Sequence, residues 1–179
     1  MAVDGRSGAG KTTIADRLAS VLDRSAVVHT DDLSWHSSFF DWSDLMIEHV
    51  LAPVRRGEPV AYRPDAWRDH DRPGAIEVPA GSRWVILEGV GAARQELAHF
   101  VDVVVWVQSD DGVARFRGIA RDGGDPAAAA FWDEWMAAEV PFLAERRPWE
   151  QADVIVNGTP PVSADPELIP VSRVPGREP

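Results

Sequence analysis

Residues 4–13 read DGRSGAGKTT, and this stretch decides the fold class of the chain. It fits the pattern G-x-x-x-x-G-K-[ST], whose fixed positions here are Gly5, Gly10, Lys11 and Thr12. The glycines let the backbone curl until successive N–H groups face one anion, and the following helix presents its positive end to that anion. A short apolar strand before the loop and helical apolar spacing over residues 11–22 supply the context that the pattern needs. The stretch therefore predicts a phosphate-binding loop.

The loop also predicts which ligands it holds. The Lys11 ammonium should reach the β- and γ-phosphates of ATP, and the Thr12 hydroxyl should bind Mg²⁺. A chance glycine-rich turn is the alternative, but it does not explain why strand, loop and amphipathic helix follow one another in this order. The residues predicted to bind ATP are Gly5, Arg6, Ser7, Gly8, Ala9, Gly10, Lys11, Thr12 and Thr13.

Composition indicates a soluble globular protein and excludes several kinds of partner. The chain has 179 residues, enough for one domain, of which 45% are hydrophobic and 26% are charged. Its net charge of −11 argues against nucleic-acid and membrane partners, since both need a basic face. It has no cysteine, no signal-like start and no apolar run long enough to cross a membrane, which predicts a cytoplasmic protein. No feature specifies an oligomeric state.

Apolar segments alternate with helical patterns along the rest of the chain. The pattern predicts strands at residues 25–29, 84–87, 101–107 and 152–156, and helices at 43–52, 110–121 and from Pro126 onward. Pro141 should kink or divide the last helix. This alternation predicts a parallel sheet covered on both faces, which binds its ligands at the carboxyl ends of its strands. Gly5, Asp31 and Glu88 each follow a strand directly, so they should converge on one crevice.

Missing motifs narrow the reaction type. The chain lacks the N-K-x-D of GTPases and the L-S-G-G-Q of transporter ATPases. Its second buried strand ends in Glu88 and a glycine, where hydrolytic ATPases commonly have an Asp-Glu pair. A small-molecule kinase is the class that is left, and transfer to a hydroxyl needs a carboxylate that takes the proton. Asp31 and Asp32 are the candidates, with the capping of a turn as the alternative role for the pair.

Seven stretches resemble the uridine kinase and nicotinamide riboside kinase family, in the order seen there. They read GRSGAGKTT, HTDDLSW, FDW, GEPVAY, VILEGV, RGIARD and ADVIVNG, and they extend to Gly158. The resemblance implies an α/β P-loop NTPase fold with a five-stranded parallel sheet, helices on both faces and a short lid. It implies a kinase domain at 1–158, with a substrate-binding insertion at about 34–74 and a lid at about 115–127. A Pro-rich tail, extended or disordered, follows at 159–179.

The resemblance also implies roles for single residues. Asp31 resembles the catalytic base, and Glu88 resembles the carboxylate that orients Mg²⁺ through water. Arg117 and Arg121 resemble the lid arginines that stabilise charge on the transferred phosphoryl group. The residues that resemble substrate-binding positions are Asp32, Asp41 and Tyr62.

The segment from residue 34 to 74 leaves the acceptor open. Its aromatic residues could form a stacking pocket, with Trp35 and Trp42 as the main candidates, or they could pack in the core. Its arginines could bind an acceptor phosphate or lie in solvent. The sequence therefore predicts ATP- and Mg²⁺-dependent transfer to a hydroxyl of a small acceptor, which the resemblance suggests is a nucleoside. A nucleoside monophosphate kinase and a nucleotide-binding regulator without transfer activity are the alternatives.

Overall fold

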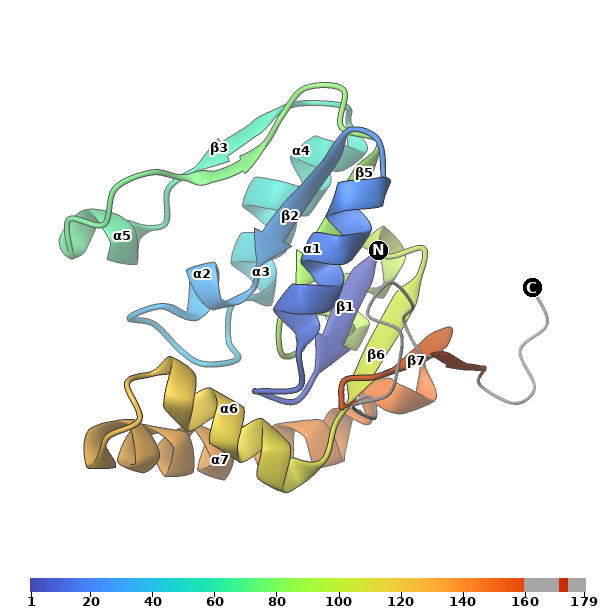
Figure 1. Ribbon diagram of the computed structural model, residues 1–179. Helices are drawn as coiled ribbons and strands as arrows, with labels where there is room; N and C mark the ends of the chain where they lie inside the picture. Colours follow the sequence, from blue (N-terminus) through green and yellow to red (C-terminus); the bar gives the residue numbers. More distant parts are fainter. Residues whose placement is uncertain (160–170, 174–179) are drawn as a thin grey trace.

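The computed structural model describes residues 1–159 and 171–173, in which six strands form the main sheet in the order β2-β5-β1-β6-β7-β8 (Figure 1). Their bounds are β1 Ala2–Gly5, β2 Ser25–His29, β5 Trp84–Glu88, β6 Val104–Gln108, β7 Val154–Asn157 and β8 Val171–Arg173. The first five are mutually parallel, which confirms the predicted sheet. β8 adds an antiparallel edge strand from the segment predicted to be a tail. The other residues of that tail prediction, 160–170 and 174–179, lie outside the described residues.

Alternate side chains of the central strands pack into two separate cores. Ile86 in β5 belongs to the core under α1 (Lys11–Val21), whereas its neighbour Leu87 belongs to the core on the opposite face. That second core is covered by a helix in three segments, with a π-helical turn in the middle. The segments are α3 Ser43–Met46, η1 Ile47–Leu51 and α4 Ala52–Arg55. Helices therefore cover both faces, as the near-continuous apolar strands predict.

The segment after β2 adds a helix and a second, two-stranded sheet that packs on the same core. It contains α2 (Asp31–Ser34), followed beyond α4 by an antiparallel pair of strands, β3 (Val60–Tyr62) and β4 (Ile76–Val78). Between these strands lies α5 (Asp65–Asp69), which projects away from the main sheet in Figure 1.

Two helices, α6 (Asp111–Arg121) and α7 (Pro126–Arg146), lie beyond the carboxyl ends of the strands (Figure 1). Their N-caps are Asp110 and Asp125, whose carboxylates accept hydrogen bonds from backbone N–H groups three residues later. The helices pack closely, because a Cβ at Gly118 would lie 1.9 Å from the Trp132 ring. Pro141 lies inside α7 and does not divide it, which corrects one of the two predicted outcomes. The remaining short helices are the 3₁₀ segments η2 Gln95–Phe100 and η3 Pro148–Glu150.

None of the helices described here is long and apolar enough to cross a membrane.

Candidate active site

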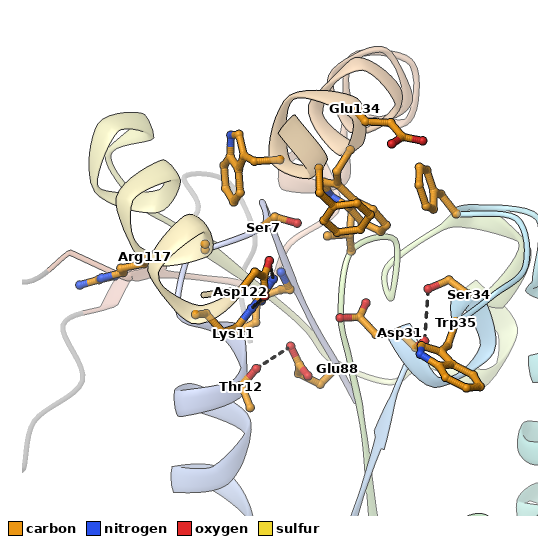
Figure 2. A pocket seen from close by; sticks show the side chains of 18 of the residues that line it. Ser7, Lys11, Thr12, Asp31, Ser34, Trp35, Glu88, Arg117, Asp122 and Glu134 are labelled. Carbon is orange, nitrogen blue, oxygen red and sulfur yellow. Dashed lines mark hydrogen bonds and ion pairs between the residues drawn. The ribbon is translucent and has the colours of Figure 1, made fainter. Parts of the chain in front are cut away.

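The phosphate loop, α2, α6 and α7 enclose a cavity of about 740 Å³ at the carboxyl ends of the strands (Figure 2). Lys11, Asp31 and Glu88 all line it, although Lys11 begins α1, Asp31 begins α2 and Glu88 ends β5. Of the three residues predicted to converge from strand ends, Asp31 and Glu88 line the cavity and Gly5 does not. The other predicted residues that line the cavity are Ser7, Gly8, Gly10, Thr12, Thr13, Trp35, Arg117 and Arg121.

The phosphate loop is packed against α6. Gly8 has φ of +72°, and a Cβ there would lie 2.1 Å from the carbonyl oxygen of Ala114, so only glycine fits. Arg6 points out of the loop and forms an ion pair with Asp111 at the start of α6. The Lys11 ammonium donates to the Arg6 carbonyl oxygen at 3.0 Å. The loop is thus held in its curled shape by contacts that involve no ligand.

Two hard oxygen ligands face each other across the start of α1. The Thr12 hydroxyl donates to a Glu88 carboxylate oxygen at 3.4 Å (Figure 2). The other Glu88 oxygen lies 2.6 Å from His29 Nδ1, and this contact raises the pKa of His29. No group of three His, Cys, Asp or Glu side chains suited to a metal occurs within residues 1–159 and 171–173. The Thr12 hydroxyl and the Glu88 carboxylate are oxygen donors of the kind that Mg²⁺ prefers, and Mg²⁺ commonly keeps water and phosphate as its other ligands.

Asp31 starts α2 on the side of the cavity opposite the loop. The Asp31 side chain is exposed to the cavity, and the elements that enclose the cavity also surround this carboxylate. This burial raises the pKa of Asp31, and the Lys11 ammonium and the Arg121 guanidinium oppose the rise. Such an environment suits a base, because the carboxylate has no cationic partner locked to it by a hydrogen bond in the structure's described part.

Arg117 and Arg121, the arginines that the resemblance assigns to a lid, line the cavity from α6. Arg121 donates two hydrogen bonds to Asp122, at 2.8 and 3.0 Å, and this pairing raises the pKa of Arg121. Arg117 donates to the Gly158 carbonyl oxygen at 2.8 Å, at the edge of the view in Figure 2. Both side chains have partners that a phosphate group could replace.

Large aromatic side chains from the segment after α2 and from α7 also line the cavity. We call this set the aromatic wall; its members are Trp35, Phe39, Phe131, Trp132 and Trp135. Phe39 and Trp135 touch across it, with ring centroids 4.6 Å apart. The α7 members were not among the sequence-based candidates, although FWDEW at 131–135 places three aromatic residues within about one and a half helical turns.

Four predicted substrate-binding residues do not line the cavity. Trp42 is 1% exposed and donates its indole N–H to the Phe39 carbonyl oxygen, so it packs in the core. Asp32 accepts a hydrogen bond from Arg72 at 2.5 Å, and Tyr62 stacks on His49 with centroids 4.1 Å apart. Asp41 is exposed outside the lining. Partners outside the cavity therefore hold Asp32 and Tyr62, whereas Trp42 is held in the core.

Two buried charges that the sequence analysis missed hold the loops around the site. Asp4 is completely buried and accepts hydrogen bonds from the backbone N–H groups of Gly5, Gly91 and Ala93. Burial raises the pKa of Asp4 to about 6. Arg94 is 4% exposed and fixes the segment that carries Phe39 by donating to the Phe40 carbonyl oxygen at 2.7 Å. Neither residue belongs to a recognisable motif, so no local signal marks it.

Solved structures provide the comparison with known proteins. A protein from Bacillus stearothermophilus, described as a possible uridine kinase, matches with a TM-score of 0.58 and 21% identity over 86% of this chain and 85% of that one. A protein from Silicibacter sp. TM1040, provisionally assigned as a fructose transport system kinase, matches with a TM-score of 0.56 and 22% identity, over 84% of each chain. No protein-family model matches the sequence, and no curated protein matches it significantly. The likeness is one of fold: the chain shares the α/β fold of these two solved structures.

Proposed function

We propose that this protein is an ATP- and Mg²⁺-dependent kinase that phosphorylates a hydroxyl group on a small acceptor resembling a nucleoside. The observation that carries the proposal is the cavity itself. It brings together the phosphate loop with Lys11, the carboxylate of Asp31 and the aromatic wall. Phosphoryl transfer needs these three parts in one cavity: a site for the phosphoryl donor, a base for the hydroxyl proton and a surface for the acceptor.

Each charged group has a separate task in this reaction. The Asp31 carboxylate accepts the proton of the acceptor hydroxyl as its oxygen bonds to the γ-phosphorus, and ADP leaves. Lys11 and Arg121 stabilise the negative charge on the phosphoryl oxygens, and this stabilisation is stronger in a site that is shielded from water. Thr12 and Glu88 would hold Mg²⁺, directly and through water respectively, and the ion would neutralise charge on the β- and γ-phosphates.

The part of the lining outside the phosphate loop and α6 favours an uncharged, flat acceptor. The described lining contains Lys or Arg only in the phosphate loop and α6, as Lys11, Arg117 and Arg121. The aromatic wall offers faces for stacking, while Ser34, Ser37 and Glu134 offer a few polar groups. A neutral nucleoside matches this division into a flat body and a few hydroxyl groups.

The alternative of a nucleoside monophosphate kinase loses its main support. The arginines of the 34–74 segment do not line the cavity, and the structure gives each a partner elsewhere. Arg56 pairs with Glu58, Arg68 with Asp65 and Arg72 with Asp32. Arg55 and Arg63 donate to the carbonyl oxygens of His99 and Arg72. An acceptor phosphate in the cavity would therefore meet no cation of its own.

The test is ADP release with Mg·ATP across a panel of nucleosides, other small alcohols and nucleoside monophosphates. We expect turnover with a neutral acceptor and a loss of about 10²–10⁴-fold in Asp31→Asn, because a positioned base contributes that much. Asp32→Asn is the matched control, since the neighbouring carboxylate pairs with Arg72 outside the cavity lining and should affect turnover far less.

Each other outcome points elsewhere. Turnover only with monophosphates would replace the proposal by the monophosphate kinase. Bound Mg·ATP without turnover on any acceptor, unchanged in Asp31→Asn, would favour a nucleotide-binding regulator.

A further inference from the structure

A buried carboxylate from α7 contacts the phosphate loop. Glu139 has no solvent exposure, and both of its carboxylate oxygens lie 3.2 Å from the backbone nitrogen of Ser7. One of them also accepts a hydrogen bond from Trp135 Nε1 at 2.6 Å. The Arg6 guanidinium lies 3.8 Å from the other. A single side chain thus joins the loop to a member of the aromatic wall.

The charge of Glu139 is unexpected at this place. Burying a carboxylate is unfavourable, and a negative charge next to a phosphate site repels the ligand. Arg6 offsets the charge, and the N–H donors of Ser7 and Trp135 satisfy the oxygens. An aliphatic residue would fill the same space without this cost. What the carboxylate adds is direction, because it fixes where the Ser7 N–H points and which way the Trp135 indole turns.

We propose that Glu139 is a positioning residue that fixes the phosphate loop in its nucleotide-binding shape and links it to the aromatic wall. The inference rests on the proposed function only in taking the loop as the nucleotide site. Contacts continue from Glu139 through Trp135 to Phe39, which lies on the segment after α2. Glu139 and Trp135 therefore connect the phosphate loop to the segment after α2.

The decisive variant is Glu139→Gln, which keeps the shape and one acceptor oxygen but removes the charge and turns an NH₂ group toward one of the two donors. Glu145→Gln is the matched control, since Glu145 is exposed on the same helix. In the protein without nucleotide, we expect amide hydrogen exchange at Ser7 to be at least about tenfold faster in Glu139→Gln and unchanged in Glu145→Gln. Titration with Mg·ATP should show affinity about tenfold or more weaker, with thermal unfolding still cooperative.

Trp135→Phe provides an independent variant if Glu139→Gln does not fold. It keeps one aromatic ring and removes the N–H donated to Glu139, together with the second ring of the indole. We expect faster Ser7 exchange and an Mg·ATP affinity weakened by about threefold, although the removed N–H points at Glu139 and not at the nucleotide. In a Glu139→Gln background the same change should have no further effect, because its route to the loop has been removed.

Two results would overturn the inference. Ser7 exchange at the wild-type rate in the folded variants would show that Glu139 does not position the loop. Faster exchange with wild-type Mg·ATP affinity would show that the contact does not serve nucleotide binding. Wild-type protein that fails to bind Mg·ATP would instead refute the proposed function, and the exchange measurement would still decide whether Glu139 positions the loop.

Discussion

Arg94→Lys tests how the segment that carries Phe39 and Phe40 is held in place. The guanidinium donates to the carbonyl oxygens of Phe40 and Gly91, at 2.7 and 3.0 Å, and to the Ser43 hydroxyl at 2.7 Å. Its Cζ also lies 3.7 Å from the centre of the Trp42 ring. Lysine keeps the positive charge but cannot present several donors in one plane. The change therefore removes the planar geometry and leaves the charge.

The size of the effect follows from the groups left without partners. An ammonium can reach one of the two buried carbonyls, so at least one oxygen loses its donor, which costs about 1–3 kcal/mol. Loss of the stacking on Trp42 adds about 0.5–2 kcal/mol. Burial lowers the pKa of Arg94 to about 10, so folding already works against this charge, and lysine inherits that penalty. We expect the free energy of unfolding to fall by about 3 kcal/mol in total.

Urea denaturation followed by tryptophan fluorescence measures this loss, with Arg83→Lys as a control at an exposed position. The acceptor KM should also rise, because the segment fixed by Arg94 carries Phe39 of the aromatic wall. A free energy of unfolding within about 1 kcal/mol of wild type would refute the reasoning, since it would mean that the three hydrogen bonds do not contribute to stability.

Three further outcomes are expected. Lys11→Ala should abolish measurable Mg·ATP binding while the unfolding midpoint stays near that of wild type, and an unaltered ATP titration would contradict the loop assignment. Gly8→Ala should weaken Mg·ATP binding more than about tenfold, because the left-handed backbone costs about 1–2 kcal/mol and the Cβ would clash with Ala114. Gly57→Ala, with φ of +77° and no atom within 4 Å of the added Cβ, is its control and should leave binding unchanged. Asp4 has a folded pKa of about 6 against 3.8 for the free group, so its contribution to stability is complete below pH 3.8 and is lost as the pH rises to 6. Relative to Asp4→Asn, the wild-type free energy of unfolding should fall by roughly 3 kcal/mol across this range, and a flat difference between the two urea series would contradict it.

The fold was accessible from the sequence because its signals are local. The N-cap residues Asp110 and Asp125 and the alternation of apolar strands with helices depend on neighbours within a few residues. β2 has the predicted bounds, whereas β6 begins at Val104, three residues after the predicted start. Apolar character marks a buried segment, but the ladder with β1 decides where the strand begins.

The candidate site could also be predicted only where its signals are local in the sequence. The phosphate loop is contiguous, so its glycines, Lys11 and Thr12 were readable without the tertiary structure, and the ends of the strands were enough to bring Asp31 and Glu88 to it. Local chemistry could not show that Asp32 turns to Arg72 or that Trp42 lies in the core under Arg94. By residue type and position in the sequence, Asp32 and Trp42 were as plausible site residues as Asp31 and Trp35.

The sequence by itself therefore determined the phosphate loop and the class of fold that presents it. Only the tertiary structure decided which side chains line the cavity and which buried charged residues hold the surrounding loops in place. The physical reason is that Glu139 and Arg94 act through partners many residues away, with Ser7 and Phe40 among them. Such pairs are created by packing of whole elements, and a pattern confined to neighbouring residues carries no record of them.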